Sequence, residues 1–82
     1  MNLTYENERD LIFCSFRYAL GRKTYIVSTI ADIILKNWEF IPENDRILFK
    51  IEIEKAIEQN NAGMAQDVEH WKQILGMNTY DK

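Results

Sequence analysis

Apolar residues in the first part of the chain recur with helical spacing. Between residues 7 and 20 they are Leu11, Ile12, Phe13, Phe16, Ala19 and Leu20. This spacing predicts a helix that begins near Asn7, a suitable N-cap with an acid three residues later, and ends near Leu20. The stripe is broad, so we expect burial on more than one side. Gly21 is expected to end this helix in the left-handed conformation.

A second helix is predicted from about Tyr25 to Trp38, with Thr24 as its N-cap. It carries two overlapping apolar stripes, which are Ile26, Ile30, Ile33 and Asn37, and Val27, Ile30, Ile34 and Trp38. We therefore expect it to be the central element of the core. The link to the first helix is short, which favours antiparallel neighbours or a helix-turn-helix corner. Pro42 stops helical structure after this segment.

The third segment combines two patterns. A helix from Asn44 or Asp45, as its cap, to about Asn60 would have Ile47, Leu48, Ile51 and Ile57 as its apolar face. Residues 49–54 instead alternate with the period of a strand. We favour the helix because no partner strand is evident and because the second half is rich in helix-forming residues.

A last helix is predicted over about Gln66–Leu75, with Asp67 as a possible N-cap and Gly76 as its stop. Its apolar stripe consists of Val68, Trp71, Ile74 and Leu75. The predicted fold class is therefore all-α, a compact bundle of three to four short helices with the second helix central. Neither an internal repeat nor a domain boundary is evident, so residues 1–82 are interpreted as a single helical domain.

The charge distribution limits the classes of partner. The net charge is −3, which argues against charge-driven binding to nucleic acid. The charges are uneven, with four bases against one acid in residues 11–38 and nine acids against five bases in residues 39–82. With a polar start, one cysteine and no long apolar run, we expect a cytoplasmic protein with no membrane contact.

No residue group points to catalysis, a cofactor or a metal. His70, the single histidine, has no neighbouring nucleophile or ligand at a useful spacing, so we expect a solvated surface histidine. Cys14 lies within an apolar run and is expected in the core. Trp38 and Trp71 are also expected to be core residues. On this basis we predict that the chain is not an enzyme.

Two groups of residues are candidates for partner binding. The first is a basic-aromatic corner at the predicted turn, consisting of Arg17, Tyr18, Arg22, Lys23 and Tyr25. Arginine and tyrosine often anchor protein interfaces, although here they could equally cap helix ends and complete the core. The second is an acidic face made of Glu52, Glu54 and Glu58. Such a face could imitate phosphates and occupy a basic channel, or it could be merely solvated.

Part of the sequence resembles small proteins of phages and prophages. The resemblance covers roughly residues 11–75 and is carried by the run CSFRYALGRKTYIV at residues 14–27, an Ile-Pro turn, a Lys/Glu-rich helix and Asp67-x-x-x-Trp71. Similar proteins often have Gly-Asp before the late aspartate, whereas this chain has Gly-Met-Ala-Gln at residues 63–66. The resemblance implies a context in which small acidic proteins inhibit host proteins, anti-CRISPR and other anti-defence proteins among them.

The resulting functional expectation is a small phage-type protein that binds a host protein or nuclease complex and inhibits it by occlusion. One alternative is a small DNA-binding transcriptional regulator, although the apolar second helix suits a DNA groove poorly. Another is a homodimeric structural module. A small enzyme or nucleotide-binding protein would instead require a deep pocket near Arg17, Arg22 or Tyr25.

Overall fold

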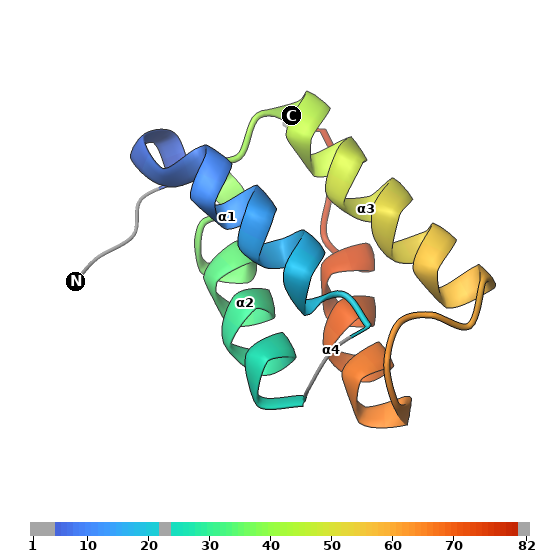
Figure 1. Ribbon diagram of the computed structural model, residues 1–82. Coiled ribbons are helices and arrows are strands. Elements are labelled where there is room, and N and C mark those ends of the chain that lie inside the picture. Colours follow the sequence, from blue (N-terminus) through green and yellow to red (C-terminus); the bar gives the residue numbers. More distant parts are fainter. Residues whose placement is uncertain (1–4, 22–23, 81–82) are drawn as a thin grey trace.

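The computed structural model describes residues 5–21 and 24–80. Within them the elements are α1 (Tyr5–Ala19), α2 (Thr24–Lys36), the short 3₁₀ helix η1 (Trp38–Phe40), α3 (Glu43–Glu58) and α4 (Ala65–Leu75) (Figure 1). No strand occurs in these described residues, and the ambiguous segment 48–54 lies within α3. The all-α prediction is therefore confirmed.

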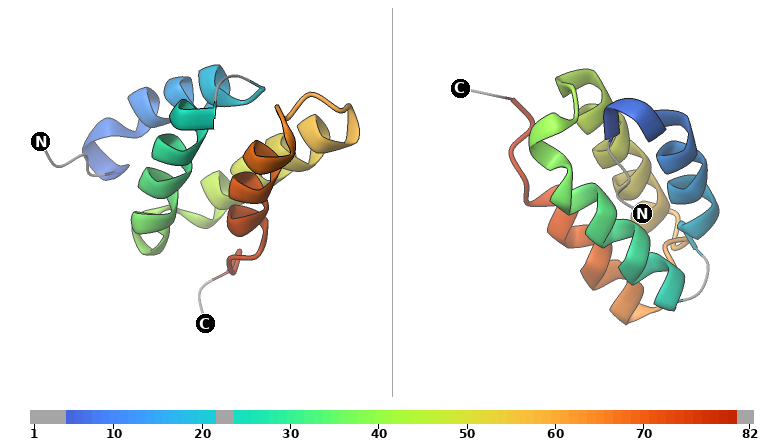
Figure 2. Two further views of the ribbon diagram at one scale, coloured as in Figure 1. Left: turned by 90° about the horizontal axis from the view of Figure 1, so that it is seen from below. Right: turned by 90° about the vertical axis from the view of Figure 1, so that its left-hand side faces the viewer.

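The four helices form a flat bundle that measures 30 × 30 × 16 Å. Helix α2 packs against both α1 and α4, and α3 packs against α4. In the left-hand view of Figure 2, α1 lies at one edge and α3 reaches the other, with α2 and α4 between them. The central position predicted for the second helix is thus confirmed, and α1 has one side that no other described helix covers.

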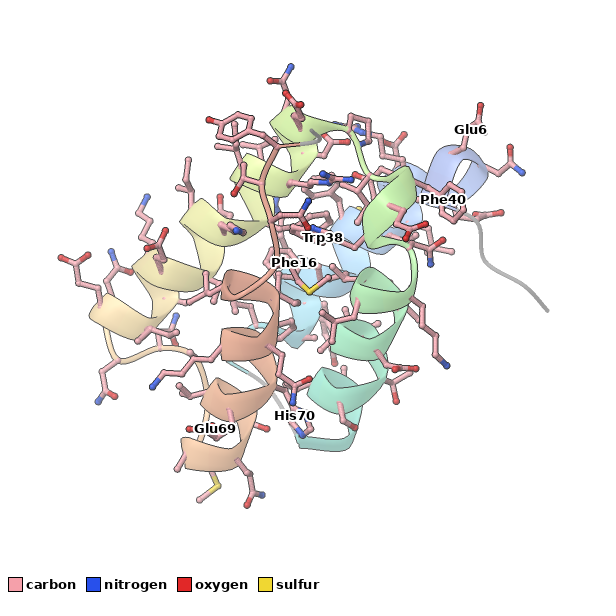
Figure 3. The ribbon with its side chains drawn as sticks, turned by 180° about the vertical axis from the view of Figure 1, so that it is seen from behind. Glu6, Phe16, Trp38, Phe40, Glu69 and His70 are labelled. Carbon is pink, nitrogen blue, oxygen red and sulfur yellow. The ribbon has the colours of Figure 1, made fainter. Side chains whose placement is uncertain are left out.

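Aromatic rings connect the helices at the centre of the core. Phe16 of α1 is fully buried, and its ring meets Phe49 of α3 and Trp71 of α4 edge to face, with centroids 4.9 and 5.4 Å apart. Such edge-to-face pairs add to the stabilisation from buried area. Figure 3 shows Phe16 inside the bundle and Phe40 at its rim. Trp38 and Trp71 are both buried, as predicted.

The turn after α1 has the predicted geometry. Gly21 has φ +84°, a left-handed conformation that glycine adopts without a steric penalty. A Cβ at this position would lie 2.9 Å from the carbonyl oxygen of Asn61. Gly21 therefore packs closely against the loop between α3 and α4, and this position requires glycine for two independent reasons.

Several predicted helix boundaries are wrong. The N-cap of α3 is Pro42 and not Asn44 or Asp45, because Asp45 turns inward and is buried. Asp67 is not the cap of α4 but its third residue, where Oδ2 accepts a 2.9 Å hydrogen bond from the backbone N–H of the N-cap Met64. Thr24 is the first residue of α2 and not its cap.

Other boundaries differ by a few residues. Helix α1 begins at Tyr5, before the predicted start, because Tyr5 is buried, and the helix is irregular at Glu8 (φ −117°, ψ 22°). Helix α2 ends at Lys36, and Trp38 begins η1. Gly76 follows the last residue of α4 and is its C-cap, so this predicted stop is confirmed.

Four apolar residues that were predicted to lie in the core are exposed. Cys14, expected in the core, is exposed, and so is Leu11. On α3 the buried residues are Phe49, Ile53 and Ala56, whereas the predicted core residues Leu48 and Ile51 are exposed. Positions 49, 53 and 56 follow helical spacing, so they share one face, and Ile51 falls on the opposite side of the helix.

The C-terminal segment after α4 is held against α3 and η1 by backbone carbonyl groups. The indole N–H of Trp38 donates a 2.7 Å hydrogen bond to the carbonyl oxygen of Asn78. Buried Arg46 donates to the carbonyl oxygens of Trp38 at 2.8 Å and Thr79 at 3.4 Å, and Lys50 donates to that of Met77. None of the described helices has the length and apolar character needed to cross a bilayer.

Candidate partner-binding surfaces

The solvent side of α3 combines large apolar residues with carboxylates. We name it the α3 outer surface, and it consists of Ile47, Leu48, Ile51, Glu54 and Glu58. Ile51 is 50% exposed and Leu48 is 40% exposed. Residues 47, 51, 54 and 58 are three or four positions apart and therefore lie in one row along the helix. The apolar half of this row comes first, and the acidic half follows toward the C-terminal end of α3.

Arg17 lies on the side of α1 near α3. The guanidinium carbon of Arg17 lies 5.6 Å from the ring centroid of Phe13, which in turn stacks on Phe49 at 4.4 Å. Among residues 5–21 and 24–80, no carboxylate forms an ion pair with Arg17. The cation–π contact restrains the guanidinium group while its N–H donors remain accessible to a partner.

A small hollow separates α1 from α3 at this point. It has a volume of about 200 Å³ and is lined by Arg9, Asp10, Phe13, Cys14, Arg17 and Leu48. Pockets for drug-sized ligands usually have volumes of roughly 300–1,000 Å³. The hollow is therefore better suited to one side chain of a protein partner than to a cofactor.

One end of the contact between α1 and α3 is fixed by an ionic network. Arg9 donates two hydrogen bonds to Asp45, from Nε to Oδ2 at 2.7 Å and from Nη2 to Oδ1 at 2.9 Å. The hydroxyl of Tyr5 donates to the same Oδ2 at 2.6 Å. The hydrogen bond from Arg9 holds the pKa of Asp45 below its ordinary value, and burial raises the pKa of Tyr5. This network is structural and leaves Arg9 less available to a partner than Arg17.

The predicted basic-aromatic corner is only partly described. Arg17 and Tyr18 are exposed on α1, and the Tyr18 side chain is 60% exposed. Arg22 and Lys23 lie outside the described residues. The backbone of Tyr25 belongs to the first turn of α2, and its side chain is not described. Whether the five residues form one surface therefore stays a prediction.

The predicted acidic face divides into two parts. Glu54 and Glu58 are exposed on the α3 outer surface. Glu52 is half-buried and lines a separate hollow of about 250 Å³ together with Leu20, Lys55, Ala56, Gln59 and Asn61. The three glutamates thus do not form one continuous acidic row.

A polar hollow of about 440 Å³ lies between α2 and α4. Its lining includes Ser28, Asp32 and His70, and Figure 3 shows His70 on the side of α4 that faces α2. Asp32 forms a 2.9 Å ion pair with Lys36. His70, expected to be a solvated surface histidine, lines this open hollow and is half-buried. No group of three metal-ligating side chains occurs within the described residues.

The sequence interpretation missed the exposed apolar residues of α1 and α3. Leu11, Leu48 and Ile51 were predicted to be core residues because they share helical spacing with other apolar residues, and Cys14 because it lies within an apolar run. The available signal was that both helices carry more apolar residues than one face can hold. On α3, Ile51 and Ile53 cannot both face the core, because residues two positions apart lie on opposite sides of a helix.

The comparisons with known proteins do not identify a relative. No protein-family model matches the chain, and neither a curated protein nor a solved structure is significantly similar to it.

Proposed function

We propose that this protein is a binding module that inhibits a host bacterial protein by covering part of its surface, with the α3 outer surface in contact. The partner class that fits best is a nuclease complex of a host defence system, as the resemblance to phage proteins suggests. The mechanism requires only shape and charge. The supporting observation is the exposure of Leu48 and Ile51 directly beside Glu54 and Glu58.

The apolar half of the α3 outer surface supplies the driving force for association. Ile51 and Leu48 are three residues apart and both leave a large part of the side chain in water. Removing such apolar area from water contributes about 25 cal/mol per Å². Neighbouring apolar residues on one helix face also match the way an exposed helix enters a groove of a partner.

The acidic half supplies orientation. Glu54 and Glu58 are four residues apart, so both carboxylates point from the same side of α3. A basic surface on the partner, such as a channel that binds nucleic acid, would be attracted to them. The protein would then exclude nucleic acid by occupying the channel that normally contacts phosphates.

The regulator alternative is less well supported by α2. The exposed residues of this helix include Thr29, Asp32 and Lys36, and the last two form an ion pair with each other. A recognition helix needs side chains that are free to contact base edges and phosphates. The exposed side of α2 offers no net positive charge for this purpose.

The test is affinity capture from a bacterial lysate with tagged protein, followed by mass spectrometry. Four chains are compared, which are the wild type, Ile51→Asp, the double variant Glu54→Lys/Glu58→Lys, and Phe40→Asp as a control. Phe40 is 70% exposed in η1, so its replacement makes the same chemical change on a different surface. We expect one protein to be captured by the wild type and the control and lost by the two α3 variants.

The captured protein is then purified and its nucleic-acid cleavage or binding is measured with each variant added. Inhibition by the wild type and by Phe40→Asp, but not by Ile51→Asp, would support occlusion through α3. Capture that survives both α3 variants, or is lost equally with Phe40→Asp, would contradict the proposal.

A further inference from the structure

The outward side of α1 has the pattern of a helix that pairs with a copy of itself. Leu11, Cys14 and Tyr18 are separated by three and four residues and therefore form one stripe along the helix. All three are exposed, Leu11 by 52% and Tyr18 by 60%. Figure 1 shows α1 on the near side of the bundle, in front of α2, and the flank with Asp10 and Arg17 borders the hollow that leads to Leu48 of α3. We call this stripe, together with Asp10 and Arg17, the α1 outer face.

Two opposite charges lie on one flank of this stripe. Asp10 directly precedes Leu11, and Arg17 directly precedes Tyr18, so the two charged residues occupy equivalent positions two helical turns apart. Seven residues correspond to about 10 Å along the helix axis. In heptad terms both are g positions next to an a/d seam.

Neither Asp10 nor Arg17 is held in a strong ionic interaction among the described residues. Asp10 is 95% exposed at its side chain and has only a long 3.4 Å contact with Arg9, which is itself held by two hydrogen bonds to Asp45. Arg17 lies on the ring of Phe13 and has no ion pair among the described residues. Both groups are therefore available to a molecule that approaches α1.

We propose that the occupant of the α1 outer face is α1 of a second copy, in antiparallel orientation. A twofold axis midway between Asp10 and Arg17 passes close to Cys14. It brings each Asp10 opposite the Arg17 of the other copy, because equivalent flanks meet in antiparallel helix pairs. In a parallel pair g positions face e positions of the other helix, so Asp10 and Arg17 would not meet each other. The charge pattern thus selects both the partner and its direction.

This inference does not rest on the proposed inhibition, because its residues all belong to α1, although Leu48 of the α3 outer surface borders the same hollow as Asp10, Cys14 and Arg17. A single pair of short helices makes a small interface, so the dimer is weak. It should be measured by sedimentation velocity across ~10 µM to ~1 mM protein, where weak association becomes visible. The wild type is expected to shift from monomer toward dimer over this range.

A charge swap provides the decisive test. Asp10→Arg and Arg17→Asp each create two like-charge contacts per dimer, and each should weaken dimerisation about tenfold. The double variant Asp10→Arg/Arg17→Asp re-forms both contacts in reverse and keeps the net charge of −3, so its affinity should return to near that of the wild type. Glu69→Arg, an exposed reversal on α4, is the control and should change nothing.

Crosslinking gives a second readout. Cys14 is the single cysteine of the chain and lies near the proposed axis, so a short bismaleimide should link two copies through it. Crosslinking should fall with either single reversal and recover in the double variant. A wild type that stays monomeric at all concentrations, or a double variant that remains as weak as the single ones, would overturn the proposal.

Discussion

Asp45 occupies a position where a side chain could either cap α3 or join it to α1. The sequence favours the cap, because aspartate near the start of a helix usually accepts backbone N–H groups. In the structure the carboxylate instead accepts from Arg9 and Tyr5 of α1. The partners are 36 and 40 residues away, so only the assembled fold reveals them.

The depressed pKa of Asp45 makes stability depend on pH in a defined direction. The unfolded chain binds the proton more readily, so this contribution is complete above the unfolded pKa of about 4 and disappears as pH falls through the lower folded value. We expect Asp45→Asn to reduce stability by about 1–2 kcal/mol at pH 7, because the carboxylate that accepts from Arg9 is lost. The loss is no larger because solvent screens the half-exposed Arg9. Thermal unfolding at stepped pH should show the difference from wild type shrinking at acid pH, and a constant difference would contradict this role.

Gly63 should be more sensitive to substitution than Gly76. Gly63 has φ +85°, and a Cβ there would lie 2.5 Å from Oδ2 of Asp67, the atom that accepts the hydrogen bond at the start of α4. We expect Gly63→Ala to lower stability by about 1–3 kcal/mol through strain and a weakened cap. Gly76→Ala is the matched control, since its Cβ would find ordinary contacts and its backbone is right-handed. Equal effects in urea unfolding would contradict this explanation.

At the scale of single elements, α3 shows why the type of structure was easier to predict than its orientation. Helix formers in its second half correctly favoured a helix over a strand. Its orientation was not recoverable, because apolar residues occur on two sides and a periodic pattern cannot say which side meets the core. The orientation of α3 is set by Phe49, whose ring stacks on Phe13 and contacts Phe16 edge to face. Both contacts depend on the position of α1.

Two isoleucines on α3 provide a direct check of this orientation. Ile53 is fully buried, whereas Ile51 is 50% exposed. We expect Ile53→Ala to lower the free energy of unfolding by about 3 kcal/mol through lost burial and a cavity, and Ile51→Ala to change it by less than about 0.5 kcal/mol. Urea denaturation of both variants would measure this, and similar losses would show that the two sides of α3 are assigned incorrectly.

The candidate surfaces, like the orientation of α3, could be predicted from the sequence only in part. Arg17, Tyr18, Glu54 and Glu58 are exposed as charged and aromatic residues tend to be, so the sequence was sufficient to nominate them. The apolar residues beside them were assigned to the core because sequence alone cannot distinguish a surplus apolar residue from a buried one. Binding surfaces often consist of such exposed apolar residues, and these can be identified only once the structure shows which residues fill the core.

At the scale of the whole molecule, the segment after α4 completes the side of the bundle that α3 and η1 form. The carbonyl groups of Met77, Asn78 and Thr79 accept hydrogen bonds from Lys50, Trp38 and Arg46, respectively. These contacts join residues that are 27 to 40 positions apart. The segment therefore acts as a strap that shields Trp38 from water.

A chain truncated after Gly76 should lose this strap while keeping all four helices. The donors of Trp38, Arg46 and Lys50 would then lose these carbonyl partners, and we expect a loss of about 2–3 kcal/mol in stability, near one for each hydrogen bond. Trp38 would become accessible, so acrylamide should quench its fluorescence, whereas Trp71 is enclosed by other helices and should stay protected. A chain that ends at Tyr80 retains the three carbonyl groups and is the control. If the shorter chain matches this control in stability and quenching, the strap neither stabilises the fold nor shields Trp38.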